Sequence, residues 1–300
     1  MESCSESTRL EGEPLAGTAG QADALIAVSW PKPLWDPEKA VRSKGLPADL
    51  ERLVGREERA GRKVSFRVFQ RGSRPPTDRP ELIGLAAGGR SLRIAQVALP
   101  DLSSRIASFL EGGRVGPSLE ETLVLVCTDG RHDRCCATHG APLYRALRTE
   151  TDRRGDLQVA ESSHLGGHRF AGSVLFLPGG EMYGRLRCGD VPGLLDAWSR
   201  GTVLVPRFRG RLGAPETLQV AEVYVRGLHP EAEGVELELT EHSKRGAWVR
   251  ATVRSREATH RLEVECLLRS FESPTRCSKH NESRERWIAA SVRQPSGTTG

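Results

Sequence analysis

Residues 122–147 read TLVLVCTDGRHDRCCATHGAPLYRAL, and this stretch sets the fold class. Its first six residues form a short apolar run with branched side chains, which is typical of a buried strand. A loop rich in cysteine follows, and Pro142 can open a helix with Leu143, Ala146 and Leu147 on one face. The stretch therefore predicts a strand, a thiol-bearing loop and a helix in succession.

The pattern continues downstream. Alternating and apolar runs predict strands at 157–162, 173–177 and 181–186, and a glycine pair between the last two is typical of a tight turn. A helix then begins after Asp190. The order of the elements is therefore β-α-β-β-β-α.

The same order is found upstream, which predicts two tandem copies of one α/β fold. The second copy alone carries clustered cysteine and histidine, so we assign the chemistry to it. The upstream elements are expected as strands at 24–30, 64–68, 81–86 and 92–97, and as helices at 48–60 and after Asp101.

A small α+β appendage is expected beyond the second copy, with a helix from Pro215 to Arg226 and an antiparallel meander. We expect both ends of the chain to be loose because they are rich in Ser, Gly and charged residues. The predicted boundaries are 1–20 for a flexible N-terminus, 21–116 for the first α/β copy, 117–205 for the second, 206–280 for the appendage and 281–300 for a flexible tail.

Composition narrows the class of protein. Seven cysteines are an odd number spread over 300 residues, unlike a secreted disulfide framework, so clustered thiols indicate metal ligation or catalysis. The formal charge is +5, but no basic stripe interleaved with aromatic residues predicts a nucleic-acid partner. No apolar run is long enough for a membrane helix, and the acidic N-terminus lacks a leader, so we expect a cytoplasmic protein.

Two short segments carry the candidate chemistry. Cys127 and Cys136 are separated by eight residues, with Cys135 adjacent and His132 and His139 nearby. Thiolates in a loop before a helix N-terminus can be exposed and stabilised, although a buried thiol that acts as a small apolar group is the alternative.

The second segment is HLGGHRFAG, which places His164 and His168 four residues apart around two glycines. The glycines favour a loop in which both rings reach one point, and a structural hydrogen-bonding pair is the alternative. The strand order places both segments at corresponding ends of neighbouring strands, so two thiols and two imidazoles can meet.

Two thiolates and two imidazoles suit either a tetrahedral zinc ion or a [2Fe–2S] cluster. A structural zinc site usually takes its cysteines from a tighter knuckle, so the wide loop favours the cluster. Isolated cysteines, with one histidine near the C-terminus, are assigned no ligand role: Cys4, Cys188, Cys277 and His280.

These segments resemble the sucrase/ferredoxin-like family, whose members carry a thioredoxin-like ferredoxin domain. The resemblance lies in CTDGRHDRCCATHG, HLGGHRFAGSVLFLPGGEMYGRL, PLAGTAGQADALIAVSW and RGRLGAPETLQVAE, and runs from about residue 14 to residue 277. The order β-α-β-β-β-α is consistent with a thioredoxin-like unit, so the resemblance implies a degenerate thioredoxin-like domain at 21–116 and a thioredoxin-like ferredoxin domain at 117–205. It also implies a [2Fe–2S] centre whose ligands here are Cys127, Cys136, His164 and His168.

The sequence departs from the family pattern beside the first cysteine. Relatives usually read C-T/S-H-G-x-R-D, whereas Asp129 stands here at the histidine position and His132 at the arginine position. These two residues, with Asp133, Cys135 and Arg169, are candidates to tune the centre through charge or hydrogen bonds.

The expected function is therefore electron transfer or redox sensing, with an unidentified redox partner protein or reductase. The alternatives are a structural zinc protein, or a thiol oxidoreductase that uses Cys135 and Cys136, whose adjacency fits the C-x-x-C geometry poorly. No pair of carboxylates stands out for sucrase chemistry, so a glycoside hydrolase is not supported.

Overall fold

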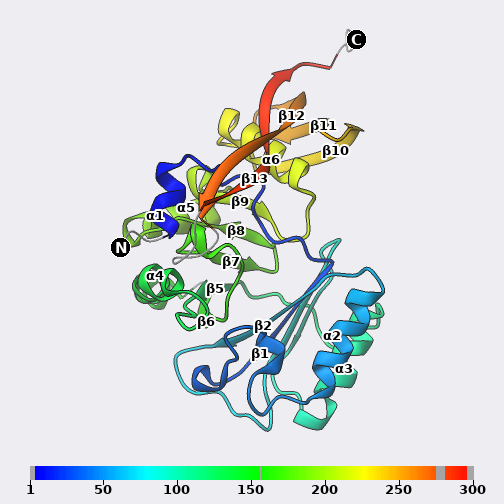
Figure 1. Cartoon of the computed structure of the whole chain (residues 1–300), viewed down its shortest axis with the longest axis vertical. Helices are drawn as coiled ribbons and strands as arrows, with labels where there is room; N and C mark the ends of the chain where they lie inside the picture. Colours follow the sequence, from blue (N-terminus) through cyan, green and yellow to red (C-terminus); the bar gives the residue numbers. More distant parts are fainter. Residues whose placement is uncertain (1–3, 156, 275–280, 296–300) are drawn as a thin grey trace.

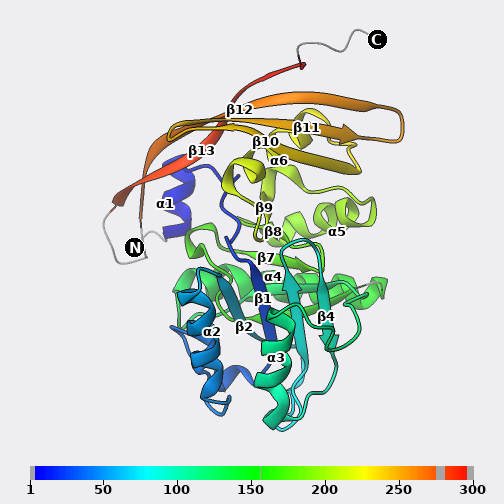
Figure 2. The same ribbon diagram turned by 90° about the vertical axis from the view of Figure 1, so that its right-hand side faces the viewer.

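The computed structural model describes residues 4–155, 157–274 and 281–295. Two sheets organise these residues: a nine-stranded sheet in the order β4-β3-β1-β2-β6-β5-β7-β8-β9 and a four-stranded antiparallel sheet in the order β10-β11-β12-β13. Figures 1 and 2 show the second sheet stacked at the end of the molecule where the C-terminus lies.

The first unit forms because apolar residues alternate along its strands and recur along its helices. Leu50, Leu53 and Val54 of α2 and Ile106 and Phe109 of α3 are buried against one face of the sheet, on the side where Figure 1 shows both helices. Its elements are β1 (Ala24–Ser29), α2 (Asp49–Arg59), β2 (Val64–Gln70), β3 (Leu82–Ala86), β4 (Ser91–Ile94) and α3 (Leu102–Leu110), with short 3-10 turns η1 (Lys32–Leu34), η2 (Ala40–Arg42) and η3 (Leu99–Asp101).

The second unit repeats this order. Its elements are β5 (Leu123–Cys127), α4 (Arg134–Arg154), β6 (Gln158–Ser162), β7 (Val174–Leu177), β8 (Glu181–Tyr183) and α5 (Val191–Ser199), with 3-10 turns η4 (His168–Phe170), η5 (Cys188–Asp190) and η6 (Val205–Arg207). In both units the first two strands are parallel and the third and fourth are antiparallel. The predicted α/β architecture of two units with one topology is confirmed.

The two units join edge to edge. β2 and β6 pair antiparallel through Phe69 with Ser162 and through Gln70 with Glu161, so the sheets of the two units become one. A core shared by both units lies on the faces that α2, α3, α4 and α5 leave uncovered; Phe69 and Ile83 come from the first unit and Leu125 and Leu175 from the second. The first unit thus packs directly against the second and covers one face of its sheet.

The C-terminal part confirms the expected α+β composition. β9 (Phe208–Arg211) extends the large sheet beside β8. Next, α6 (Glu216–Leu228) packs its buried residues Val220, Ala221 and Val225 against a four-stranded sheet through Val249 and Val264. The strands of this sheet are β10 (Gly234–His242), β11 (Gly246–Arg254), β12 (Thr259–Pro274) and β13 (Asn281–Arg293).

The two ends differ from the loose tails expected at 1–20 and 281–300. Residues 4–10 form α1 (Cys4–Leu10), which lies beside β12 and η4, and residues 281–293 pair with β12 as β13. Glu13 explains part of this order: it is buried and forms salt bridges with Arg169 and Arg286, each at 2.9 Å. The N-terminal segment is therefore fixed between η4 and β13.

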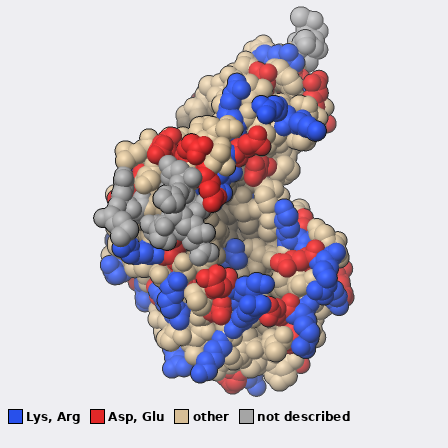
Figure 3. All heavy atoms as spheres, viewed as in Figure 1, with Lys and Arg blue, Asp and Glu red and all other residues tan. Residues whose placement is uncertain are grey.

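Acidic and basic side chains are mixed on the face seen in Figure 3, with a region of other residues between the upper and lower charged parts. Salt bridges join neighbouring strands of the C-terminal sheet, such as Arg254 with Glu236 and Arg293 with Glu263. Among the described residues, no helix combines the length and apolar character that crossing a membrane requires.

Candidate metal centre

Cys127 is placed by the strand that carries it. It is the last residue of β5, a fully buried strand that lies between β6 and β7. The loop that follows docks on the first unit: Lys32 Nζ donates to Thr128 Oγ1 at 2.9 Å, and Arg131 donates to the Trp35 carbonyl oxygen at 2.7 Å. Trp35 itself is buried and donates through Nε1 to the Trp30 carbonyl oxygen.

Cys136 lies on the first turn of α4. We expected Cys135 and Cys136 in a loop before a helix that begins at Pro142, and this is wrong: the helix begins at Arg134 and contains Pro142. Asp133 is the reason, because its carboxylate caps the helix by accepting from the Cys135 backbone N–H at 2.8 Å. The position of the Cys136 thiol is therefore set by a helix and not by a loop.

Gly140 allows α4 to approach the end of β5. A Cβ atom at this position would overlap the carbonyl oxygen of Cys127. Because this glycine is one helical turn after Cys136, the close contact brings the first turn of α4 beside the end of β5. The two thiols thus come together from a helix and a strand.

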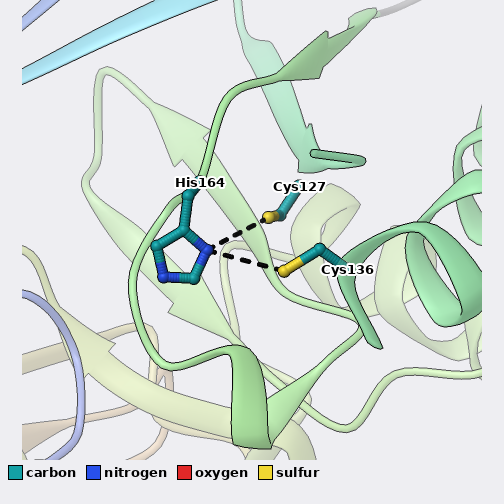
Figure 4. Close-up of side chains that lie close together, drawn as sticks. All are labelled: Cys127, Cys136 and His164. Atoms are coloured by element: carbon teal, nitrogen blue, oxygen red, sulfur yellow. Dashed lines mark hydrogen bonds between the residues drawn. The ribbon is translucent and has the colours of Figure 1, made fainter. Parts of the chain in front are cut away.

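His164 completes a group of three donors. It follows β6 by two residues, and its Nδ1 atom lies 3.8 Å from Cys127 Sγ and 3.5 Å from Cys136 Sγ. Figure 4 shows the three side chains converging from the end of β5, from α4 and from the loop after β6. Their ligand atoms all lie within 4.8 Å of one another. The structure thus brings three of the four predicted ligands together.

His168, the fourth predicted ligand, lies on the adjacent turn η4. Its ring centroid is 5.8 Å from that of His164. Its Nδ1 atom lies 3.3 Å from Cys4 Sγ and 3.3 Å from Asp133 Oδ2, which makes a second group of possible metal donors. The described part of the chain therefore holds two neighbouring groups of donors, and each predicted histidine belongs to a different one.

The two thiols of the first group differ in charge. The pKa of Cys127 is well below the ordinary thiol value because Cys136 and His164 hydrogen-bond to it, which outweighs burial. The pKa of Cys136 is raised by the same contact with Cys127 and by burial. Cys127 is therefore the more acidic thiol of the pair, and the thiolate is the form in which cysteine binds a metal.

His168 is held in the neutral form. Burial lowers its pKa to about 4, although the charge of Asp133 opposes this shift. A neutral imidazole has a ring nitrogen lone pair, which a metal ion requires. The ring is therefore ready to bind at neutral pH.

The residues expected to tune the site surround it. His132 stacks on His164 with ring centroids 3.9 Å apart and donates to the Pro37 carbonyl oxygen at 2.6 Å. Asp129 is buried, and burial together with the nearby charge of Cys127 raises its pKa. Arg169 pairs with Glu13 and covers the Phe170 ring.

The remaining cysteines fall in different places. Cys4 was expected in a loose tail but is buried against Cys135 with the two Sγ atoms 3.4 Å apart; only its residue type marked it in the sequence. Cys188 is exposed, and Cys266 is buried in the core under α6. Cys277 and His280 lie outside the described residues. His139 lies on α4, near the side chain of Arg187.

Fold and site together define a two-unit α/β protein with a thiol and imidazole centre. The family model described as sucrase/ferredoxin-like matches residues 15–210. This chain belongs to the sucrase/ferredoxin-like family.

A curated relative and two solved structures show similarity to parts of the chain. "Altered inheritance of mitochondria protein 32" of the yeast Meyerozyma guilliermondii is 31% identical over 99 residues, which are 31% of this chain and 35% of that protein. The chain therefore spans about a third of the length of this relative. A thioredoxin-like [2Fe–2S] ferredoxin from Aquifex aeolicus is 14% identical, covering 32% of this chain and 97% of its own with a TM-score of 0.29. A cysteine-to-serine variant of that ferredoxin is similar over 29% of this chain and 96% of its own, with 14% identity and a TM-score of 0.26.

Proposed function

We propose that this protein binds a [2Fe–2S] cluster through Cys127, Cys136, His164 and His168 and acts in electron transfer or redox sensing. The observation that carries the proposal is the convergence of two buried thiols and an imidazole from three separate elements. Family membership supports the same ligand set, because the motifs that carry it hold these four residues.

The distribution of the donors favours a two-iron centre over a single ion. The ligand atoms of a single zinc ion lie about 2.0–2.3 Å from the metal, so all four must crowd around one point. Here three donors lie close together, and the His168 ring lies on the neighbouring turn. A cluster divides its four ligands between two metal atoms, which accommodates a wider set.

When bound, the cluster would supply a site that accepts and releases one electron. The protein's residues set its conditions: imidazole ligands in place of thiolates reduce the negative charge, which raises the reduction potential. The stacked ring of His132 covers His164, and the buried carboxyl of Asp129 lies beside Cys127. Both groups replace residues of the usual family motif, so we expect a potential specific to this chain.

A structural zinc site is the second candidate. Three donors within 4.8 Å of one another also fit one zinc ion, with a fourth ligand from water or His168. In that case the metal would tie β5, α4 and the loop after β6 together and contribute to folding stability.

The proposed partner is a redox protein or reductase, because a cluster that carries single electrons needs a donor and an acceptor. We place this exchange in the cytoplasm, where thiols stay reduced and can bind metal. The yeast relative is named for mitochondrial inheritance, so fractionation of cells should test both compartments.

The deciding experiment is anaerobic purification of the full chain, followed by visible and paramagnetic resonance spectra and assays of iron and acid-labile sulfide. We expect a coloured protein with two irons and two sulfides per chain. A colourless protein with one equivalent of zinc would replace the cluster by the structural zinc site.

A further inference from the structure

Two thiols meet beside the proposed centre without belonging to it. Cys4 Sγ lies 3.4 Å from Cys135 Sγ, although 131 positions separate the two residues. Their exposed fractions are 2% and 1%, and with Ala171 they form a small buried cluster of their own. Cys4 is the first residue of α1, and Cys135 lies on the first turn of α4.

Several contacts hold α1 in this position. Thr8 Oγ1 donates to the Arg169 carbonyl oxygen at 2.7 Å, and Arg185 donates to the Thr8 and Glu13 carbonyl oxygens at 3.0 and 2.9 Å. The buried carboxylate of Glu13 anchors the residues that follow the helix. These contacts position α1, and Cys4 Sγ itself lies 3.3 Å from His168 Nδ1.

Cys135 and Cys136 are neighbours in the sequence, but their thiols do not face each other. Successive residues on a helix point about 100° apart. Accordingly, the thiol of Cys136 lies near His164, whereas that of Cys135 lies near Cys4. The natural partner of Cys135 is thus Cys4.

We propose that Cys4 and Cys135 are a redox-active pair that closes to a disulfide on reaction with hydrogen peroxide. A disulfide bond is about 2.05 Å long, and the two sulfurs are 3.4 Å apart. Small side-chain rotations can close the difference of roughly 1.3 Å. Peroxide is small, and local opening of the seven-residue helix α1 gives it access to the buried thiols. Neither sulfur is one of the four proposed cluster ligands, although Cys4 contacts His168, and closure of the disulfide does not require a bound cluster.

The reaction proceeds in two steps that balance. One sulfur attacks a peroxide oxygen, the O–O bond breaks, and a sulfenic acid and one water form. The second sulfur then attacks the sulfenic sulfur, the S–O bond breaks, and the second water leaves as the S–S bond forms. In total, two thiols lose two protons and two electrons, and peroxide is reduced to two waters. The product ties α1 covalently to α4 beside His168.

The test uses the full chain, treated with limiting peroxide, alkylated, digested with trypsin without reduction and analysed by mass spectrometry. We expect the peptide that ends at Arg9 to be joined to the peptide 135–145, with the joined mass about 2 Da below the sum of the two. A reductant should separate them. Cys4→Ser and Cys135→Ser should each abolish this species, whereas Cys136→Ser and the exposed-site control Cys188→Ser should retain it.

Three results would overturn the inference. The first is recovery of Cys4 fully alkylated after peroxide treatment. The second is a Cys4 cross-link that survives in Cys135→Ser and disappears in Cys136→Ser. The third is resistance to peroxide together with one equivalent of zinc that Cys4→Ser releases, since Cys4, Asp133 and His168 would then hold a metal. Visible absorption, measured on the same samples, reports on the cluster alone. Failure of the disulfide proposal can therefore be distinguished from failure of the cluster proposal.

Discussion

At the scale of single residues, the adjacent pair Cys135 and Cys136 gives the sharpest distinction. Both thiols are buried on the first turn of α4, but Cys136 lies 3.5 Å from His164 Nδ1, whereas Cys135 lies near Cys4. Cys136→Ser should therefore abolish the visible spectrum and the bound iron. Cys135→Ser is the matched control and should retain both. The reverse pattern would move the ligand role to Cys135.

The histidine ligands predict a change in potential rather than a loss of the cluster. His164→Cys and His168→Cys each replace a neutral imidazole by a thiolate, which adds negative charge to the cluster. We expect the midpoint potential to fall by on the order of 100 mV for each change, as measured by a redox titration monitored in the visible region. His260→Cys in β12 is the control. A potential that does not move in the His168 variant would exclude this residue as a ligand.

The sequence predicted the thiols and imidazoles of the site through residue type and spacing, aided by the order of the strands. It could not separate His168 from His164, because the turn η4 depends on the left-handed backbone of Gly166 and Gly167 and on contacts with α1. It also missed Cys4, since a single cysteine near the N-terminus has no local pattern. The burial of Cys4 comes from tertiary contacts 131 or more positions away.

At the scale of elements, the approach of α4 to β5 depends on Gly140. A methyl group there would overlap the Cys127 carbonyl oxygen, and a backbone atom cannot rotate away. We expect Gly140→Ala to cost about 1–3 kcal/mol of unfolding free energy in denaturant titrations and to reduce bound iron. Gly189→Ala adds the same methyl group in open space and should change neither. Unchanged stability in Gly140→Ala would show that α4 can shift without loss.

The start of α4 shows where local patterns misled. Pro142 is favourable at the first position of a helix, which made it a plausible start. In the structure Asp133 caps a helix that begins at Arg134, eight residues before the predicted start, and the cost of one proline within the helix is tolerated. The elements with clear alternation or amphipathic faces, such as β2 and α2, closely match their expected ranges because their patterns coincide with their buried faces.

At the scale of the whole molecule, the repeat was visible as an order of elements, but the way the two units join was not. The contact between β2 and β6 pairs only two residues of each strand, too few to leave a sequence pattern. The large shared core on the uncovered faces of both units instead holds them together. We therefore expect the two units to unfold in one cooperative transition.

Glu13 links three distant parts of the chain, and its charge predicts a pH dependence of stability. Burial raises the pKa of Glu13, but the hydrogen bonds and charges of Arg169 and Arg286 lower it by more. The pKa of Glu13 therefore lies below the ordinary value of 4.5. Its contribution is thus present above about pH 4.5 and is lost as the pH falls through the lower folded-state pKa.

Glu13→Gln should cost about 3 kcal/mol at neutral pH, because it leaves two partly buried arginines without the buried carboxylate that pairs with both. The difference in unfolding free energy between Glu13→Gln and the original protein should shrink in denaturant titrations below about pH 4.5. Glu58→Gln, on the exposed surface of α2, is the matched control. A difference that stays constant down to acid pH would show that the pairing contributes no charge-dependent stability.

The loop after β5 contacts Trp35, so the fluorescence of nearby tryptophans should respond to assembly of the centre. Trp30 and Trp35 are both buried, and the Trp35 indole donates to the Trp30 carbonyl oxygen. Arg131 of that loop donates to the Trp35 carbonyl oxygen. A coloured centre at Cys127 would absorb their emission by energy transfer, so assembly of the centre should dim the fluorescence of these two tryptophans. A colourless metal at the same position would leave the emission bright, which makes a simple fluorescence reading a way to follow which centre forms.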